Sequence, residues 1–191
     1  MGSSWSQRHR LRLGAENRSH ITVKGVLTVE SIEEVCLRAR GGSHGSWPWT
    51  RKMLARADAQ FGGVWRELSI DGNAALDILL PPHSGEPCKG DQLTLVADEG
   101  ATVREAAAAL AAFGEAYARN NPSCAERLRF AADAPFTHLI LCTAPLDWEE
   151  YGRVTPRPGA YYCIDGFHRL AAWAAAGRLS SGATISVWLA G

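Results

Sequence analysis

The sequence has no surplus of charge, no paired cysteine motif and no long apolar run. Lys plus Arg and Asp plus Glu each total 20 among the 191 residues, so the net charge is zero. A protein that binds a nucleic-acid backbone usually carries a basic surplus. The basic cluster at 8–12 is more typical of a solvated tail than of a binding surface. Nucleic acid is therefore not an expected partner.

The cysteines and the apolar residues argue against further classes of protein. Five cysteines are scattered without any C-x-x-C pair, which argues against a zinc knuckle or a thioredoxin motif. Reduced thiols in a cytoplasmic protein are the simplest interpretation. No apolar run is as long as a membrane span, and the polar N-terminus lacks the apolar segment of a signal peptide. We therefore expect a cytoplasmic protein without a membrane partner, with mobile residues 1–19 before a single domain over 20–191.

Apolar periodicity and capping signals predict an α+β domain, with a small mixed sheet and flanking helices. The helix with the strongest signals is 102–120, which begins with a capping box of Thr102 and Glu105. The dipeptide Asp71-Gly72 predicts a β-hairpin. Further helices are expected at 29–40, at 50–61 and from Ser123, strands at 64–70, 74–80, 92–97 and 137–142, and a loop or single helical turn at 145–151. The chain is expected to end with a strand at 161–164, a helix at 166–177 and a strand at 185–189, both strands in one sheet.

The segment 160–173, A-Y-Y-C-I-D-G-F-H-R-L-A-A-W, is the expected functional site. Asp165 is placed to cap the helix that follows, and Gly166 permits a tight turn and close approach of a ligand. A helix N-terminus attracts anions, and His168 and Arg169 would add donors there. Arg169 opposes the helix dipole, which an anionic ligand would explain. In the alternative, purely structural interpretation, Asp165 only caps the helix, His168 is a satisfied half-buried residue and Arg169 pairs with an acid.

The run D-G-F-H-R-L-A-A resembles the D-G-H-H-R-x-x-A signature of the ParB/sulfiredoxin-like superfamily. That superfamily includes chromosome-partitioning nucleotide-binding proteins, sulfiredoxin and free-serine kinases, and only the C-terminal part of this chain resembles it. The resemblance implies that Asp165, Gly166, His168 and Arg169 bind nucleotide phosphates or assist phosphoryl transfer. It makes ATP or ADP, with Mg²⁺, the candidate cofactor. Phe167 stands where the family has the first His of its pair, so a role that needs this imidazole is not carried over.

Phosphoryl transfer needs a general base, and two glutamates are candidates. Glu30 lies on the first expected helix, where the superfamily's kinases place their base. Glu149 lies in the P-L-D-W-E-E-Y loop that leads into the motif strand, and Trp148 beside it could stack on a base or ring. The alternative for Glu30 is a solvated acidic face, and for Glu149 and Trp148 it is loop packing.

His83 lies with Ser84 and Glu86 in the turn-rich loop L-P-P-H-S-G-E and is a further candidate for ligand binding. Together with His168 these side chains could bind a metal ion, since His and Glu are suitable ligands. No H-x-x-x-H or H-E-x-x-H spacing supports such a site, so no metal is predicted.

The leading hypothesis is a small cytoplasmic enzyme that binds a nucleotide or other phosphorylated ligand at the D-G-F-H-R turn and acts on a small metabolite. Phosphoryl transfer to an amino-acid-like acceptor is one form of it. The high content of Ala, Gly and Arg favours a bacterial source and a place in specialised metabolism. One alternative is a non-catalytic module of the same fold that senses a nucleotide or binds a partner. Another is a specialised-metabolism enzyme that uses the scaffold without a nucleotide.

Overall fold

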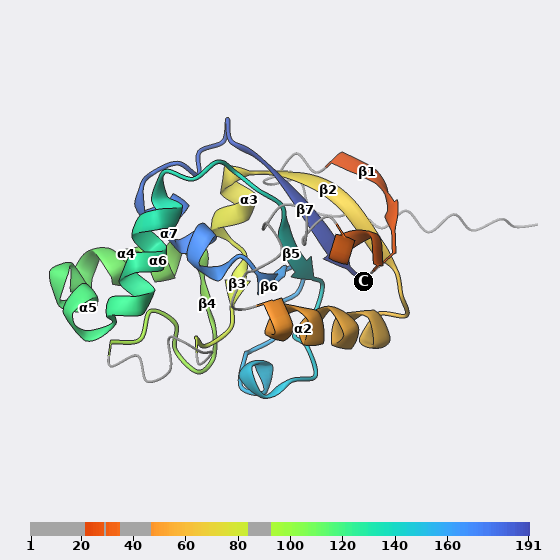
Figure 1. Cartoon of the computed structure of the whole chain (residues 1–191), viewed down its shortest axis with the longest axis horizontal. Helices are drawn as coiled ribbons and strands as arrows, with labels where there is room; N and C mark the ends of the chain where they lie inside the picture. Colours follow the sequence, from red (N-terminus) through yellow and green to blue (C-terminus); the bar gives the residue numbers. More distant parts are fainter. Residues whose placement is uncertain (1–21, 29, 35–46, 84–92) are drawn as a thin grey trace, which may run out of the picture.

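The computed structural model describes residues 22–28, 30–34, 47–83 and 93–191 (Figure 1). The predicted N-terminal segment 1–19 lies outside these ranges, as do Ser84, Glu86 and residues 35–40 of the first expected helix. Residues 30–34 of that helix are described, and they are helical. The strands are β1 (Thr22–Leu27), β2 (Trp65–Asp71), β3 (Leu79–Leu80), β4 (Ala101–Thr102), β5 (Leu139–Cys142), β6 (Tyr162–Asp165) and β7 (Thr184–Ala190). The helices are α2 (Trp47–Gln60), α3 (Gly72–Leu76), α4 (Val103–Phe113), α5 (Glu115–Asn120), α6 (Pro122–Ala132), the 3₁₀ turn η1 (Glu149–Tyr151) and α7 (Phe167–Ala175).

The strands form one mixed sheet in the order β1-β2-β7-β5-β6-β3-β4. The pairs β5/β7 and β3/β6 are parallel, and the other neighbouring pairs are antiparallel. The predicted α+β class, with a mixed sheet and flanking helices, is therefore confirmed. The strand–helix–strand ending is confirmed too, with β6 and β7 in the same sheet on either side of β5.

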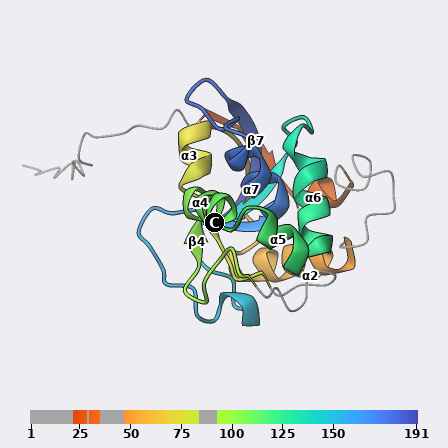
Figure 2. The same ribbon diagram turned by 90° about the vertical axis from the view of Figure 1, so that its left-hand side faces the viewer.

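The sheet separates two apolar cores. Successive residues of a strand point to opposite faces, so Cys163 of β6 joins one core while Tyr162 and Ile164 join the other. The first core packs under α4, α6 and α7, and the second under α2 and the η1 region. Figure 1 shows α4, α6 and α7 gathered at one end of the molecule, and Figure 2 shows this end facing the viewer.

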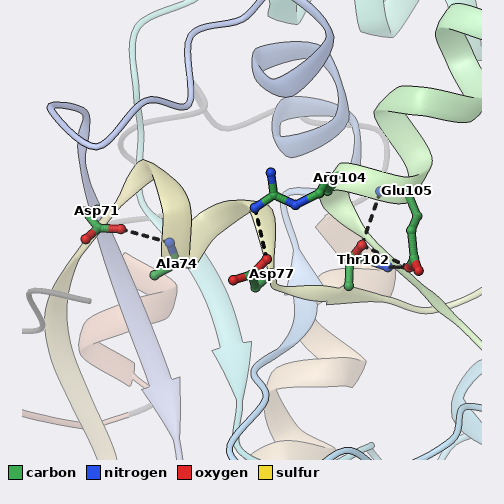
Figure 3. Close-up of polar contacts among 6 residues, drawn as sticks. All are labelled: Asp71, Ala74, Asp77, Thr102, Arg104 and Glu105. Carbon is green, nitrogen blue, oxygen red and sulfur yellow. Dashed lines mark hydrogen bonds and ion pairs between the residues drawn. The ribbon is translucent and has the colours of Figure 1, made fainter. Parts of the chain in front are cut away.

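The predicted hairpin at Asp71-Gly72 is wrong. The Asp71 carboxylate accepts a hydrogen bond from the Ala74 N–H at 2.8 Å and caps α3, where the second strand was expected (Figure 3). A Cβ on Gly72 would lie 2.2 Å from the Ser180 carbonyl oxygen, so glycine is needed there for close backbone approach. An aspartate followed by glycine suits a helix N-cap as well as a turn, and tertiary packing decided between the two.

Two further predictions need correction. The expected strand at 92–97 is not formed over its described residues: Leu95 and Val96 are buried, but in a bent loop. The expected helix 102–120 begins at its capping box but breaks at Gly114, whose φ is +51°, so that α4 and α5 are separate. A left-handed φ of this kind costs glycine little and ends a regular helix.

Candidate functional site

The turn between β6 and α7 is shaped by Gly166. This residue is the N-cap of α7, and its φ is +121°, a value that side-chain-bearing residues rarely adopt. A Cβ at Gly166 would lie 2.4 Å from the Cδ2 atom of Leu139, which is buried in β5. Glycine is therefore required by packing as well as by backbone conformation, and it leaves the first turn of α7 without a side-chain cap.

The prediction that Asp165 caps α7 is wrong. Asp165 is the last residue of β6, and its carboxylate faces Arg169. The Oδ2 atom of Asp165 accepts a hydrogen bond from Arg169 at 2.7 Å, and the two side chains are 14% and 21% exposed. The same guanidinium donates to the carbonyl oxygen of His138 at 2.8 Å and to the hydroxyl of Thr137. Arg169 thus ties the start of α7 to the segment that enters β5. Its place in the first turn is explained by the Asp165 carboxylate, as in the structural alternative.

The side chain of His168 points toward α6, where it meets a cysteine. Its Nε2 atom lies 3.2 Å from the Sγ atom of Cys124, in hydrogen-bonding range, and Cys124 is 1% exposed. The two residues are 44 positions apart in sequence. They meet because α6 and α7 pack side by side over the first core.

His83 completes the group from a third segment, just after β3. Its ring stacks on Phe167, with centroids 4.3 Å apart and planes inclined by 12°, and it meets His168 edge-on at 4.7 Å. The Nε2 atom of His83 is buried and has no hydrogen-bond partner among the residues that the structure describes.

His83, Cys124 and His168 form one compact cluster of potential ligand atoms. One ligand atom from each lies within 4.8 Å of the other two, and no carboxylate belongs to the cluster as far as the chain is described. The prediction named His83 and His168 but missed Cys124. No local spacing could have revealed Cys124, since the cluster draws on three segments that are brought together only by tertiary packing.

The other predicted ligand residue, Trp148, belongs to the opposite face of the sheet. Its ring packs against the second core, and the guanidinium carbon of Arg56 lies 5.7 Å from its centroid. Glu149, the next residue, is exposed at the start of η1. The buried part of α7, by contrast, belongs entirely to the first core. The described contacts therefore do not join Trp148 or Glu149 to His168, and loop packing accounts for Trp148.

Glu30 is exposed, and its described interactions are those of a helix N-terminus. Hydrogen bonds from the backbone at Glu30 and from the Thr28 side chain lower the pKa of this carboxyl. The Thr28 hydroxyl also accepts a hydrogen bond from the N–H of Ser31, so Thr28 caps this helix. A solvated acid at a helix start explains Glu30 without a catalytic role.

The fold and the cluster together define a small α+β protein with one mixed sheet and a histidine–cysteine site at a helix start. The profile of DUF6309, a family of unknown function, matches residues 43–191, and the chain belongs to this family. No curated protein and no solved structure shows a significant match to the chain. Within the described residues, no helix combines the length and the apolar character needed to cross a membrane.

Proposed function

We propose that this protein is a small cytoplasmic enzyme that binds a phosphorylated small molecule, such as a nucleotide, at the first turn of α7 and acts on a small metabolite. The observation that carries the proposal is the meeting of two imidazoles, His83 and His168, at a helix start that has no side-chain cap. Two histidines from distant segments are not needed to close such a turn.

The local electrostatics favour an anion. The first N–H groups of a helix have no partner within the helix, and the helix dipole places partial positive charge there. The imidazoles of His83 and His168 can each donate a hydrogen bond to a phosphate oxygen. Arg169 contributes through its ion pair with Asp165, which positions the turn, and we do not assign it a direct phosphate contact.

Imidazole is the side chain most often used for general acid–base catalysis. His168 is oriented by its contact with Cys124, which suits a base whose ring must be held in one position. Glu149 and Glu30, the carboxylates proposed from sequence, are both exposed and lack described contacts with this cluster. We therefore assign the acid–base role to histidine and leave phosphoryl transfer as one form of the reaction.

The test combines ligand binding with turnover. Nucleotides, inorganic phosphate and phosphorylated metabolites are screened by thermal shift, and the ligands found are assayed for release of ADP or AMP with amino-acid acceptors. We expect His83→Gln and His168→Gln to weaken binding of the ligand found by roughly tenfold or more, about 1.5–3 kcal/mol for a hydrogen bond to a charged group. His138→Gln is the matched control, since that ring stacks on Trp188.

Three outcomes separate the alternatives. Binding with turnover supports the enzyme. Nucleotide binding without turnover of any acceptor supports the sensing module instead. Binding of a carboxylate metabolite in place of every phosphorylated compound supports the nucleotide-free enzyme, and it would contradict the phosphate site.

A further inference from the structure

We propose that His83, Cys124 and His168 form a transition-metal site, with zinc as the preferred ion and one coordination position left for a water or a substrate. The inference goes beyond the anion site, because it needs no phosphorylated ligand. It rests on the three side chains themselves. With the metal bound, His83 and His168 would serve as its ligands in place of the hydrogen-bonding and acid–base roles proposed above.

The chemistry of the donor set points to zinc. Thiolate and imidazole are ligands that zinc takes in proteins, and catalytic zinc sites keep three protein ligands, with three histidines or two cysteines and one histidine among the known sets. Carboxylate-rich sets suit magnesium or calcium instead, and the cluster contains no carboxylate among its described members. Two imidazoles and a thiol therefore favour a borderline-soft metal.

The distances agree with this assignment. Zn–N bonds of about 2.0–2.1 Å and a Zn–S bond of about 2.3 Å place tetrahedral ligand atoms roughly 3.4–3.6 Å apart. The Cys124 Sγ and His168 Nε2 atoms are 3.2 Å apart, and all three ligand atoms lie within 4.8 Å of one another. The buried Nε2 atom of His83 is a second, independent sign, since no described residue satisfies it.

The elements around the cluster hold it in place. Cys124 lies in the first turn of α6 and His168 in the first turn of α7, and these two helices pack against each other. His83 is held by stacking on Phe167. Side chains fixed by packing are what a preorganised metal site requires, and both histidines are half-buried.

The experiment uses the full chain, purified under reducing conditions, stripped with a chelator and titrated with Co²⁺ and Zn²⁺. We expect about one equivalent of Co²⁺ to bind, with the thiolate-to-cobalt charge-transfer absorption and the d–d bands of a four-coordinate site. Zn²⁺ should displace it. Competition with a chromophoric chelator then gives the Zn²⁺ affinity.

Three variants and two controls decide the assignment. His83→Gln, Cys124→Ser and His168→Gln should each weaken Zn²⁺ binding at least about a hundredfold, since loss even of an outer-shell partner costs 10–100-fold. Cys124→Ser should also abolish the charge-transfer band. The controls Cys142→Ala and His138→Gln, which lie outside the cluster, should leave the Zn²⁺ affinity and the charge-transfer band unchanged. Circular dichroism checks that each variant is folded, and His83→Gln, at a half-buried position, tests the site even if Cys124→Ser does not fold.

The proposal is overturned if the stripped chain binds no Co²⁺ or Zn²⁺, or if folded His83→Gln binds them as the wild type does. Rapid alkylation of Cys124 in the wild type, unchanged by added Zn²⁺, would also overturn it and would favour a nucleophilic thiol paired with His168. Failure of the phosphate-binding test leaves these measurements unaffected, so the two proposals fail separately.

Discussion

At the residue scale, the motif turn depends on one glycine and one ion pair. Gly166 combines a positive φ with close approach to Leu139, and Arg169 uses its guanidinium for Asp165 and for the chain entering β5. The residues that resemble a phosphate-binding signature therefore also stabilise this fold. Substitutions at Gly166 and Arg169 measure this contribution to stability.

Replacing Gly166 with Ala should destabilise the protein by about 2–5 kcal/mol. The new Cβ would strain the backbone, at about 1–2 kcal/mol, and would overpack the buried Leu139 side chain, at a further 1–3 kcal/mol. Denaturant unfolding followed by circular dichroism measures the change. Gly177→Ala is the matched control, because Gly177 has φ +68° with nothing within 4 Å of its added Cβ. The Gly177→Ala variant should lose only the stability that backbone strain costs. Equal losses of unfolding free energy in both variants would contradict the packing argument.

Replacing Arg169 with Ala should cost about 1.5–3 kcal/mol of stability, because it removes the guanidinium that donates to the half-buried Asp165 carboxylate and to the His138 carbonyl oxygen. The side chain is only 21% exposed, so its loss should cost more than the loss of a solvent-facing arginine. A double-mutant cycle with Asp165→Asn measures the coupling. A coupling energy near zero would mean that the pair contributes nothing to the turn.

At the element scale, helix ends show where local sequence signals are reliable. The capping box of α4 forms as the sequence predicts: Thr102 accepts from the Glu105 N–H at 3.1 Å, and the Glu105 carboxylate accepts from the Thr102 N–H at 2.6 Å (Figure 3). Both partners lie within one turn, so no distant contact is needed. The Asp77–Arg104 ion pair in the same view is exposed and should contribute little.

The capping box also gives a pH dependence. Hydrogen bonds from the backbone and side chain of Thr102 lower the pKa of Glu105, so its charged form is favoured in the folded state. This stabilisation is present above the carboxyl's unfolded pKa and is lost as the pH falls through the lower folded value. At neutral pH Glu105→Gln should therefore cost about 0.3–1 kcal/mol, the range for a charge at an exposed helix start. Unfolding free energies measured from neutral to acidic pH should show the difference vanish in acid. Glu115→Gln at the exposed start of α5 is the comparison, and a difference that grows in acid would contradict the assignment.

At the scale of the whole molecule, the sheet keeps its two cores apart and encloses two thiols. Cys142 faces the second core and Cys163 the first. Burial raises the pKa of both thiols well above the ordinary value, so almost none of the reactive thiolate forms while the protein is folded. They are structural residues, whereas Cys124 is a ligand of the proposed metal site.

We expect Cys142 and Cys163 to resist iodoacetamide in the native protein and to react only through unfolding. Their alkylation, followed by mass spectrometry, should speed up together as denaturant lowers the free energy of unfolding, because both lie in strands at the centre of the sheet. Alkylation of either thiol at the rate of an unfolded peptide under native conditions would show that this part of the sheet opens locally.

The sequence by itself determined the features that arise from neighbouring residues. The α+β class, the capping box at Thr102, the caps at Thr28 and the strand–helix–strand ending all follow from local hydrogen bonding and apolar periodicity. The dipeptide Asp71-Gly72 fits both a hairpin turn and a helix N-cap, and the hairpin prediction was wrong. Which of the two forms depended on the close approach of the distant Ser180 carbonyl oxygen.

Only the tertiary structure decided the composition of the candidate site. The D-G-F-H-R run marked the right turn, but Asp165 and Arg169 bind each other there, and the chemistry-bearing partners of His168 come from 44 and 85 residues away in sequence. Cys124 and His83 meet His168 because α6, α7 and the end of β3 pack around one core. Contacts between distant segments are set by the burial of apolar surface across the whole sheet, and no spacing within one segment encodes them.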